Sequence, residues 1–337
     1  MATVYPIFSR LRRKRTKASI RELIQETSLR ASQLIMPYFV IPGLQKKEPL
    51  PSLPGLHAFS TDELLFSIEK LTEKGIRAVI LFPVIPVEWK SATAEFCFIQ
   101  NNFFLQALEQ VRLHFPDLCL IVDVALDPFT SHGHDGIINE QGEVMNDETV
   151  ELLARLAVLY GRSGVDFVAP SDMMDGRILY IRQQLDNQGL SHVGIISYAA
   201  KYSSSLYAPF RKALGSIQPQ GIDKKGYQLN PANQREALLE AATDEKEGAD
   251  ILLIKPASLY LDILTLLRKK TLLPLAAYHV SGEYAMVMAA AEKNWLDPDR
   301  VFSESLLAIK RAGADFILTY AAKRVAQQLA NIPLDKY

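Results

Sequence analysis

The sequence predicts an α/β protein, a single (β/α)₈ barrel of the TIM type with an extended N-terminal arm. Eight short β-rich runs recur along the chain with helical stretches between them, and most of these runs are almost wholly apolar. Uninterrupted apolar runs are typical of parallel strands that are buried on both faces. Eight strand–helix units in one chain indicate a barrel. The competing doubly wound sheet is disfavoured because no Gly-x-Gly-x-x-Gly motif follows any of the runs.

The expected strands lie at 34–40, 78–84, 118–125, 165–170, 193–199, 250–255, 275–280 and 316–320. The amphipathic stretches 62–74, 147–162 and 233–247 have the pattern of helices that cover a core. Glycine can adopt the left-handed conformation that ends a helix before the next strand begins. Four triplets stand at such boundaries: Gly75-Ile76-Arg77, Gly164-Val165-Asp166, Gly248-Ala249-Asp250 and Gly313-Ala314-Asp315.

We expect residues 1–30 to form the arm and residues 31–337 to form one barrel domain. The arm contains the basic run RLRRKR at 10–15, and no apolar signal-peptide core follows it. We therefore interpret it as an exposed docking segment. The segment 215–230 contains glycines, lysines and a Gln-Pro-Gln sequence. We interpret it as a long mobile loop of the kind that often covers a barrel active site.

The composition excludes several classes of protein. Basic and acidic residues number 37 and 38, and this near balance argues against a dedicated nucleic-acid-binding protein. No run approaches the roughly 18 apolar residues that a membrane-spanning helix needs. The two cysteines, Cys97 and Cys119, are too few for a disulfide framework or a four-thiolate zinc site. We therefore expect reduced thiols and a cytoplasmic location.

Two lysines stand where strands end, which is the face on which barrel enzymes carry their reactive groups. Lys255 closes the apolar run ILLI, and Lys201 follows the preceding strand in the sequence. Two ammonium groups in a desolvated pocket lower each other's pKa, so that one can be neutral near pH 7 and form a Schiff base with a carbonyl. The alternative is that each lysine pairs with a nearby carboxylate.

Further polar residues follow the strand ends. Arginine and lysine side chains suit the binding of a carboxylate, hydroxyl groups can hold a second one, and an aspartate can act as a base. A His-x-His pair is at least as consistent with a structural role as with a metal site. These candidates are Arg211, Lys212, Lys224, Lys225, Ser281, Tyr320, Asp123, Asp127, Asp135, His132 and His134.

Five sequence blocks around the strand ends form a specific pattern. They are FPV at 82–84, DVALDPFT at 123–130, APSDMMDGR at 169–177, YQLNP at 227–231 and GADILLIKPASLY at 248–260. Together they resemble the 5-aminolevulinate dehydratase, or porphobilinogen synthase, family over roughly residues 34–320. The resemblance implies a lyase that condenses two molecules of 5-aminolevulinate to porphobilinogen with loss of two waters, in heme biosynthesis. It also implies homo-octamers or related oligomers that assemble through the arms.

The resemblance also implies roles for individual residues. Lys255 matches the lysine that forms a Schiff base with the substrate of the propionate side, and Lys201 matches the lysine of the acetate side. The family can carry arginine where this chain has Lys224, so bidentate binding is not expected there. The residues that match the carboxylate-binding groups are Ser281 and Tyr320 for the first substrate, and Arg211 and Lys224 for the second.

Our expectation about the bound metal comes from positions at which this chain differs from the family pattern. Zinc-dependent members carry three cysteines where this chain has Ala125, Asp127 and Asp135, so we expect no zinc site. The chain resembles the aspartate-containing subgroup, in which Asp127 and Asp135 hold a hard cation or none. Members of that subgroup bind an activating, allosteric magnesium through a glutamate that matches Glu240. The alternative for Glu240 is an ordinary exposed helix residue, and we expect no organic cofactor.

Two other functions compete with this interpretation. A class I aldolase would need one Schiff-base lysine, whereas two lysines and two carboxylate-binding sets favour the condensation of two keto acids. A catalytically inactive barrel that acts as a scaffold would not need both lysines together with Ser281 and Tyr320.

Overall fold

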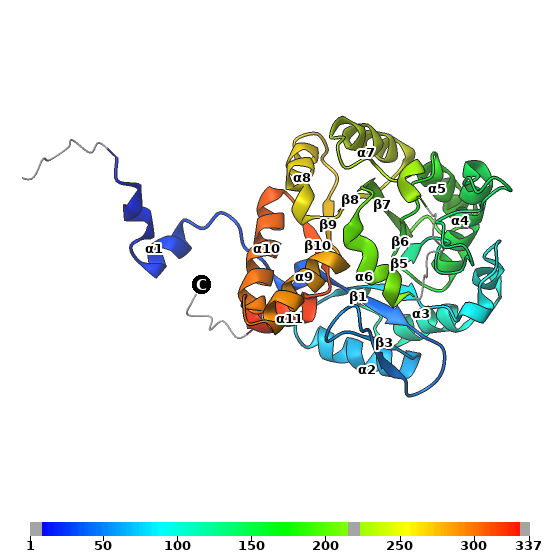
Figure 1. The fold of residues 1–337 in the computed structure, drawn as a ribbon, viewed down its shortest axis with the longest axis horizontal. Helices are drawn as coiled ribbons and strands as arrows, with labels where there is room; N and C mark the ends of the chain where they lie inside the picture. The colour runs from blue at the N-terminus through cyan, green and yellow to red at the C-terminus, as the bar shows by residue number, and fades with distance from the viewer. Residues whose placement is uncertain (1–8, 215–222, 331–337) are drawn as a thin grey trace, which may run out of the picture.

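The computed structural model describes residues 9–214 and 223–330, and its centre is a closed barrel of eight parallel strands (Figure 1). The strands neighbour one another in chain order, and the last pairs with the first to close the barrel. Every strand expected from the sequence is present, so the predicted fold is confirmed. The barrel strands are β1 (Leu34–Val40), β4 (Ala78–Pro83), β5 (Cys119–Val124), β6 (Phe167–Pro170), β7 (Gly194–Lys201), β8 (Ile251–Lys255), β9 (Leu275–His279) and β10 (Phe316–Thr319).

Two short strands were not expected. β3 (His57–Phe59) pairs in parallel with the end of β1, and β2 (Lys47–Pro49) pairs antiparallel with β3. Each has only three residues, and the segment around them contains Pro42, Pro49, Pro51 and Pro54. Such a short, proline-interrupted segment carries too little periodicity to be recognised as strands.

Helices surround the barrel, as Figure 1 shows. The outer helices are α2 (Thr61–Thr72), α3 (Phe103–His114), α4 (Asn146–Arg162), α5 (Arg177–Asn187), α7 (Arg235–Glu247), α8 (Leu261–Arg268), α9 (Ser281–Glu292), α10 (Pro298–Ala312) and α11 (Ala322–Ala330). The short α6 (Ala208–Ala213) lies nearer to the barrel axis than the outer helices do. It belongs to the segment that follows β7 and therefore stands at the carboxyl end of the strands.

One arrangement recurs at the amino ends of the strands. Gly164 has a φ of +86°, and a Cβ placed there would lie 3.0 Å from the stem of Arg112. Asp166, two residues on, accepts hydrogen bonds from the Leu120 amide at 2.7 Å and from the Arg112 guanidinium at 2.5 Å. The Asp166 amide in turn donates to the Leu120 carbonyl. One glycine–aspartate unit thus joins β5, β6 and the end of α3.

Two further copies of this arrangement join β7 to β8 and β9 to β10. In each, a left-handed glycine lies against an arginine stem, and the aspartate accepts a backbone N–H of the neighbouring strand. The copy between β7 and β8 consists of Arg182, Gly248, Asp250 and Ile195. The copy between β9 and β10 consists of Arg268, Gly313, Asp315 and Leu275. In the first of these the arginine pairs with Asp186 instead of the strand aspartate. The fourth triplet keeps its left-handed Gly75 but has Arg77 in the aspartate position.

Leu29, near the end of the arm, packs against the core, whereas the first described part of the arm lies away from the barrel (Figure 1). It contains a 3₁₀ turn at Leu11–Arg15 and the helix α1 (Ala18–Leu23), and neither has a buried residue. The Leu23 side chain is 85% exposed. Residues 1–8 of the expected arm, 215–222 of the expected loop and 331–337 of the expected barrel domain lie outside the described residues. Among the helices that are described, none has the length and apolar character to cross a membrane.

Candidate active site

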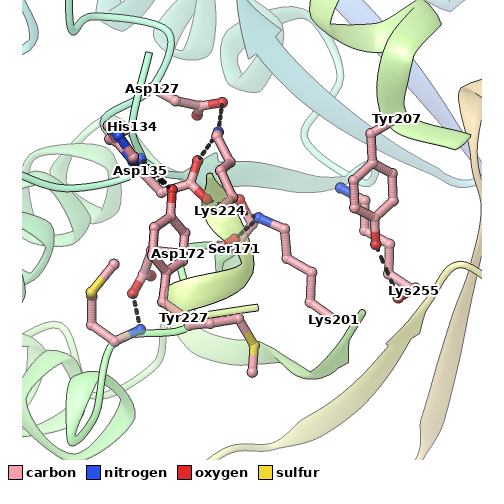
Figure 2. A network of polar contacts seen from close by, with 12 residues as sticks. Asp127, His134, Asp135, Ser171, Asp172, Lys201, Tyr207, Lys224, Tyr227 and Lys255 are labelled. Carbon is pink, nitrogen blue, oxygen red and sulfur yellow. Dashed lines mark hydrogen bonds and ion pairs between the residues drawn. The ribbon is translucent and has the colours of Figure 1, made fainter. Parts of the chain in front are cut away.

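Lys201 and Lys255 stand side by side at the carboxyl ends of β7 and β8. β7 continues two residues beyond its expected end and includes Lys201. In the parallel pairing of β7 with β8, Lys201 is the register partner of Lys255. Both side chains are nearly inaccessible, with 5% of Lys201 and 7% of Lys255 exposed. Figure 2 shows the Lys201 ammonium beside Ser171 and Asp135, and Lys255 beside Tyr207. The structure therefore brings together the two lysines that the sequence analysis selected.

Lys255 lies among aromatic rings. Its Nζ is 4.9–5.5 Å from four ring centroids, those of Tyr278, Tyr198, Tyr207 and Phe210. Among the described residues Nζ makes no hydrogen bond. Burial and the neighbouring ammonium of Lys201 lower the pKa of Lys255 to about 7. A substantial fraction of this lysine is therefore a neutral amine near pH 7, which is the form that attacks a carbonyl.

Lys201 has a different environment. Its Nζ lies 3.3 Å from Oδ2 of Asp135 and donates a hydrogen bond to the Ser171 carbonyl. Both contacts place oxygen acceptors against the Lys201 side chain. The two lysines are thus adjacent in register but unequal in surroundings, since one faces rings and the other faces oxygen atoms.

Asp123, at the end of β5, is the carboxyl group that faces the lysines. Burial raises its pKa to about 7, and the charge of Asp127 adds to this effect, although Lys255 and Lys201 oppose it. Its Oδ1 is buried and has no hydrogen-bond partner among the described residues. A carboxyl group that titrates near neutrality and has a vacant oxygen can accept or return a proton.

The two expected hydroxyl groups follow β9 and β10. The Ser281 hydroxyl accepts from the Phe210 amide at 3.1 Å and donates to the Leu206 carbonyl at 3.1 Å, so it joins the segment that carries α6. The Tyr320 hydroxyl lies 3.0 Å from that of Tyr278, one of the rings around Lys255. Both groups therefore connect directly to the wall of the Lys255 pocket.

The two expected cations of the second set lie on the segment between β7 and β8. Arg211 is on α6, with its guanidinium carbon 6.0 Å from the Tyr207 ring centroid, and it has no ion pair among the described residues. Lys224 instead contacts two carboxylates, at 2.7 Å from Asp135 Oδ1 and 3.3 Å from Asp127 Oδ2. Burial would lower the pKa of Lys224, but the two aspartates outweigh it and raise the pKa.

The same lysines determine the pKa of Asp135. Burial alone would raise its pKa, but the ammonium groups of Lys201 and Lys224 hold it well below the usual range for a carboxyl group. The two ammonium groups therefore favour the ionised form of Asp135. Figure 2 shows it between the two lysines, with Asp127 on the far side of Lys224.

Several residues of the site had no signal strong enough to be selected from the sequence. The aromatic residues around Lys255 come from four separate elements, and only their positions in space make them a group. Lys90 is partly buried near Asp127, and burial lowers its pKa. Glu283 accepts the Ser258 amide at 2.7 Å and the Val280 amide at 2.5 Å. It thereby ties the loop after Lys255 to the loop before Ser281.

The zinc-ligand positions and the two histidines show no metal-binding arrangement. Ala125 offers no ligand, and Asp127 and Asp135 face Lys224. His132 has both ring nitrogens occupied, by the Ala92 carbonyl and by the His134 amide. Over residues 9–214 and 223–330 there is no group of three or more His, Cys, Asp or Glu residues arranged to hold a metal ion.

Glu240 lies on α7 at a cavity of about 720 Å³ that His134 and Tyr227 also line. Asp175, Glu143 and Glu236 also line this cavity. Burial raises the pKa of Glu240, while Arg177 opposes that effect. Its carboxylate makes no hydrogen bond or ion pair with any described residue. A partly buried carboxylate in an acidic, water-accessible cavity suits a hard, hydrated divalent ion.

Comparison with known proteins identifies close relatives over almost the whole chain. The family model described as delta-aminolevulinic acid dehydratase matches residues 8–328. The delta-aminolevulinic acid dehydratase of Chlamydia pneumoniae is 52% identical over 320 residues, which cover 95% of this chain and 96% of that protein. The chloroplastic enzyme of Glycine max is 46% identical over 97% of this chain and 79% of its own length.

A solved structure has the same fold. The delta-aminolevulinic acid dehydratase (porphobilinogen synthase) of Toxoplasma gondii, in complex with the reaction product porphobilinogen, superposes with a TM-score of 0.94. It is 45% identical, and the match covers 96% of this chain and 92% of that chain.

Proposed function

The chain belongs to the delta-aminolevulinic acid dehydratase family, and from this premise we propose that Lys255 and Lys201 carry its reaction as two Schiff bases. The protein is a lyase that condenses two molecules of 5-aminolevulinate to porphobilinogen, with loss of two waters, in heme biosynthesis. The observation that carries the proposal is the register pairing of two buried lysines at the ends of β7 and β8.

The first chemical step follows from the unequal surroundings of the lysines. The neutral Lys255 amine adds to the ketone of one substrate, and loss of water leaves an imine. Lys201, as a neutral amine, does the same to the second substrate. We assign the uptake of a proton to Asp123, because its carboxyl group interacts electrostatically with both lysines and its Oδ1 has no hydrogen-bond partner among the described residues. Each imine replaces one ketone oxygen, so that two waters leave in total.

The bond-forming steps use the two imines differently. The imine at Lys255 withdraws electrons from its substrate and makes its carbon an acceptor. The imine at Lys201 acidifies the adjacent carbon, whose proton passes to a base, and the carbon–carbon bond forms. The free amine of one substrate then adds to the imine carbon of the other, which closes the ring and releases a lysine. Elimination of the Lys255 amine from the carbon at which the carbon–carbon bond formed, with loss of ring protons, gives the aromatic pyrrole, and both lysines return to their starting state.

We assign the carboxylate-binding roles to the groups around these lysines. Ser281 and Tyr320 would hold the first substrate, supported by their direct contact with the wall of the Lys255 pocket. Arg211 would hold the second, supported by its position on α6 without an ion pair among the described residues. Lys224 fits this role less well because its ammonium is engaged by two aspartates.

Reduction with borohydride in the presence of 5-aminolevulinate tests the lysine assignment. We expect peptide mapping to locate the reduced adduct on Lys255, and on Lys201 at higher substrate concentration. Lys310→Arg, at the amino face of the barrel, is the matched control and should leave the labelling unchanged. An active enzyme with no adduct on Lys255 would refute the mechanism.

We also assign an activating magnesium to Glu240 and place the chain in the subgroup that lacks the zinc cysteines. The support is the acidic cavity at Glu240 and the absence of cysteine at positions 125, 127 and 135. There the ion would neutralise neighbouring carboxylates away from the reacting atoms. Titration of chelator-treated protein with Mn²⁺, followed by EPR, should show a site that Glu240→Gln removes. Restoration of activity by zinc but not by magnesium would contradict the assignment.

We assign the arm, residues 1–30, to assembly of a homo-octamer, and the remainder to one catalytic domain. The arm's described helix has no buried residue and exposes Leu23, which supports a role in contact with another subunit. Light scattering coupled to size exclusion should show smaller particles after deletion of residues 1–26. The free cysteines Cys97 and Cys119 support our assignment to the cytoplasm.

A further inference from the structure

Lys224 occupies the position between two carboxylates that a bridging cation would take. Its Nζ lies 2.7 Å from Asp135 Oδ1 and 3.3 Å from Asp127 Oδ2. The remaining oxygen of Asp135, Oδ2, lies 3.3 Å from the Lys201 ammonium. Both oxygens of Asp135 therefore already face a positive charge, as Figure 2 shows.

The charge balance around these groups is complete without a metal ion. Asp123, Asp127 and Asp135 supply three carboxyl groups, and the ammonium-bearing side chains of Lys201, Lys224 and Lys255 face them. A divalent ion would add two positive charges to a buried cluster, and an unbalanced buried charge is costly. It would also need several free oxygen ligands, which Asp135 cannot offer while two lysines hold it.

The neighbouring histidines do not supply the missing ligands. The ring nitrogens of His132 face the Ala92 carbonyl and the His134 amide, and Nδ1 of His134 lies 3.3 Å from the Tyr227 hydroxyl. The Tyr227 hydroxyl also accepts the Asp135 amide at 3.3 Å. These contacts hold the Asp135 loop in place without a metal ion. The residues at Asp127 and Asp135 thus do not fit a second, active-site cation.

We propose that the ammonium group of Lys224 is the resident cation of this active site and takes the place of a metal ion between Asp127 and Asp135. A lysine is suited to this because its charge is compact and its three N–H donors can point to separate carboxylates, whereas the planar fork of arginine favours one carboxylate. The bridge holds the Asp135 carboxylate in place, and Asp135 in turn positions Lys201. Lys224 is therefore a positioning residue for Lys201, an inference that rests on the proposed role of Lys201.

Metal binding gives a readout that is independent of activity. Glu240→Gln serves as the background, because it removes the other proposed divalent site. EPR titration of this variant with Mn²⁺ should show no site at the aspartates. The double variant Glu240→Gln/Lys224→Gln lacks the internal cation, and its affinity for Mn²⁺ should be at least tenfold higher than that of Glu240→Gln. A further Asp127→Asn change should abolish that gain in affinity. Lys224→Arg keeps the charge and should not create the site.

Two results would overturn the proposal. One is a Mn²⁺ site in Glu240→Gln that Asp127→Asn eliminates while Lys224 is intact. The other is a folded Glu240→Gln/Lys224→Gln protein, checked by circular dichroism, that binds no more Mn²⁺ than Glu240→Gln does. Borohydride labelling of Lys255 in the Lys224 variants separates this outcome from failure of the proposed function, since the labelling does not depend on the bridge.

Discussion

The two ends of the barrel strands differ in how their polar side chains are hydrogen-bonded. At the amino ends, Asp166, Asp250 and Asp315 each accept a backbone N–H of the neighbouring strand. At the carboxyl ends, Asp123 Oδ1, the Tyr198 hydroxyl and Gln228 Oε1 are buried without a hydrogen-bond partner among the described residues. The three aspartates at the amino ends are therefore used by the fold, whereas some of the buried polar groups at the carboxyl ends are left available to a substrate.

Strand β8 shows the difference within a few residues. Asp250, just before it, accepts the Ile195 amide at 2.7 Å, and Lys255, its last residue, has an ammonium that no described residue hydrogen-bonds. The same neighbour, β7, provides the contact at both ends. Residues at the amino ends of this strand pair therefore serve stability, and those at the carboxyl ends serve the proposed reaction. Substitutions at one end should change the stability, and substitutions at the other end should change the activity.

The largest expected effect is the loss of the Lys255 amine. Lys255→Met keeps the apolar contacts but removes the nucleophile, so we expect kcat to fall by about 10⁴-fold or more. The stability should stay the same or rise, because a buried charge is removed. Product formation and urea unfolding measure the two quantities. A variant that loses more than 2 kcal/mol of stability, at the scale of a buried ion pair, would show that Lys255 also serves the fold.

Removal of the proposed proton acceptor, Asp123, should have the next largest effect. Asp123→Asn keeps the size of the side chain but cannot take up a proton, so kcat should fall by roughly 10²–10⁴-fold. Rapid-quench measurement of the Lys255 adduct should still detect the first imine, since that step does not require Asp123. Equal loss of adduct and product would instead indicate that Asp123 only positions Lys255.

The pH dependence should report the pair of lysines. The pKa of Lys255 is lowered to about 7, so its neutral amine, and with it the rate of adduct formation, should rise as pH increases through that value. Lys201→Gln removes the neighbouring positive charge, which is the second cause of the shift after burial. The rising limb should therefore move to higher pH by about one unit. Stopped-flow measurement of adduct formation provides the profile, and an unmoved limb would mean that burial alone controls the pKa.

The two ends also differ in how well the sequence predicted them. The apolar runs and the glycine triplets repeat, so strands and the boundaries before them could be recognised from local pattern alone. Lys255 could be recognised because a charge that closes an apolar run is costly without a purpose. The contact between Lys224 and Asp135 had no such signal, because the two residues are 89 positions apart and neither lies in a periodic element. The aromatic ring set around Lys255 was hidden for the same reason.

The smallest expected effect on activity comes from the amino end. Asp250→Ala leaves the Ile195 amide without its acceptor, which should cost about 1–3 kcal/mol of stability. Asp250→Asn keeps an acceptor oxygen and should cost less. Both variants should retain kcat within about twofold, because the reactive groups stand at the other end of the strands. Urea unfolding at constant m-value measures the first effect. If Asp250→Ala remained folded yet lost kcat tenfold, the two ends would be coupled through β8, and the division of labour along the strand would have to be abandoned.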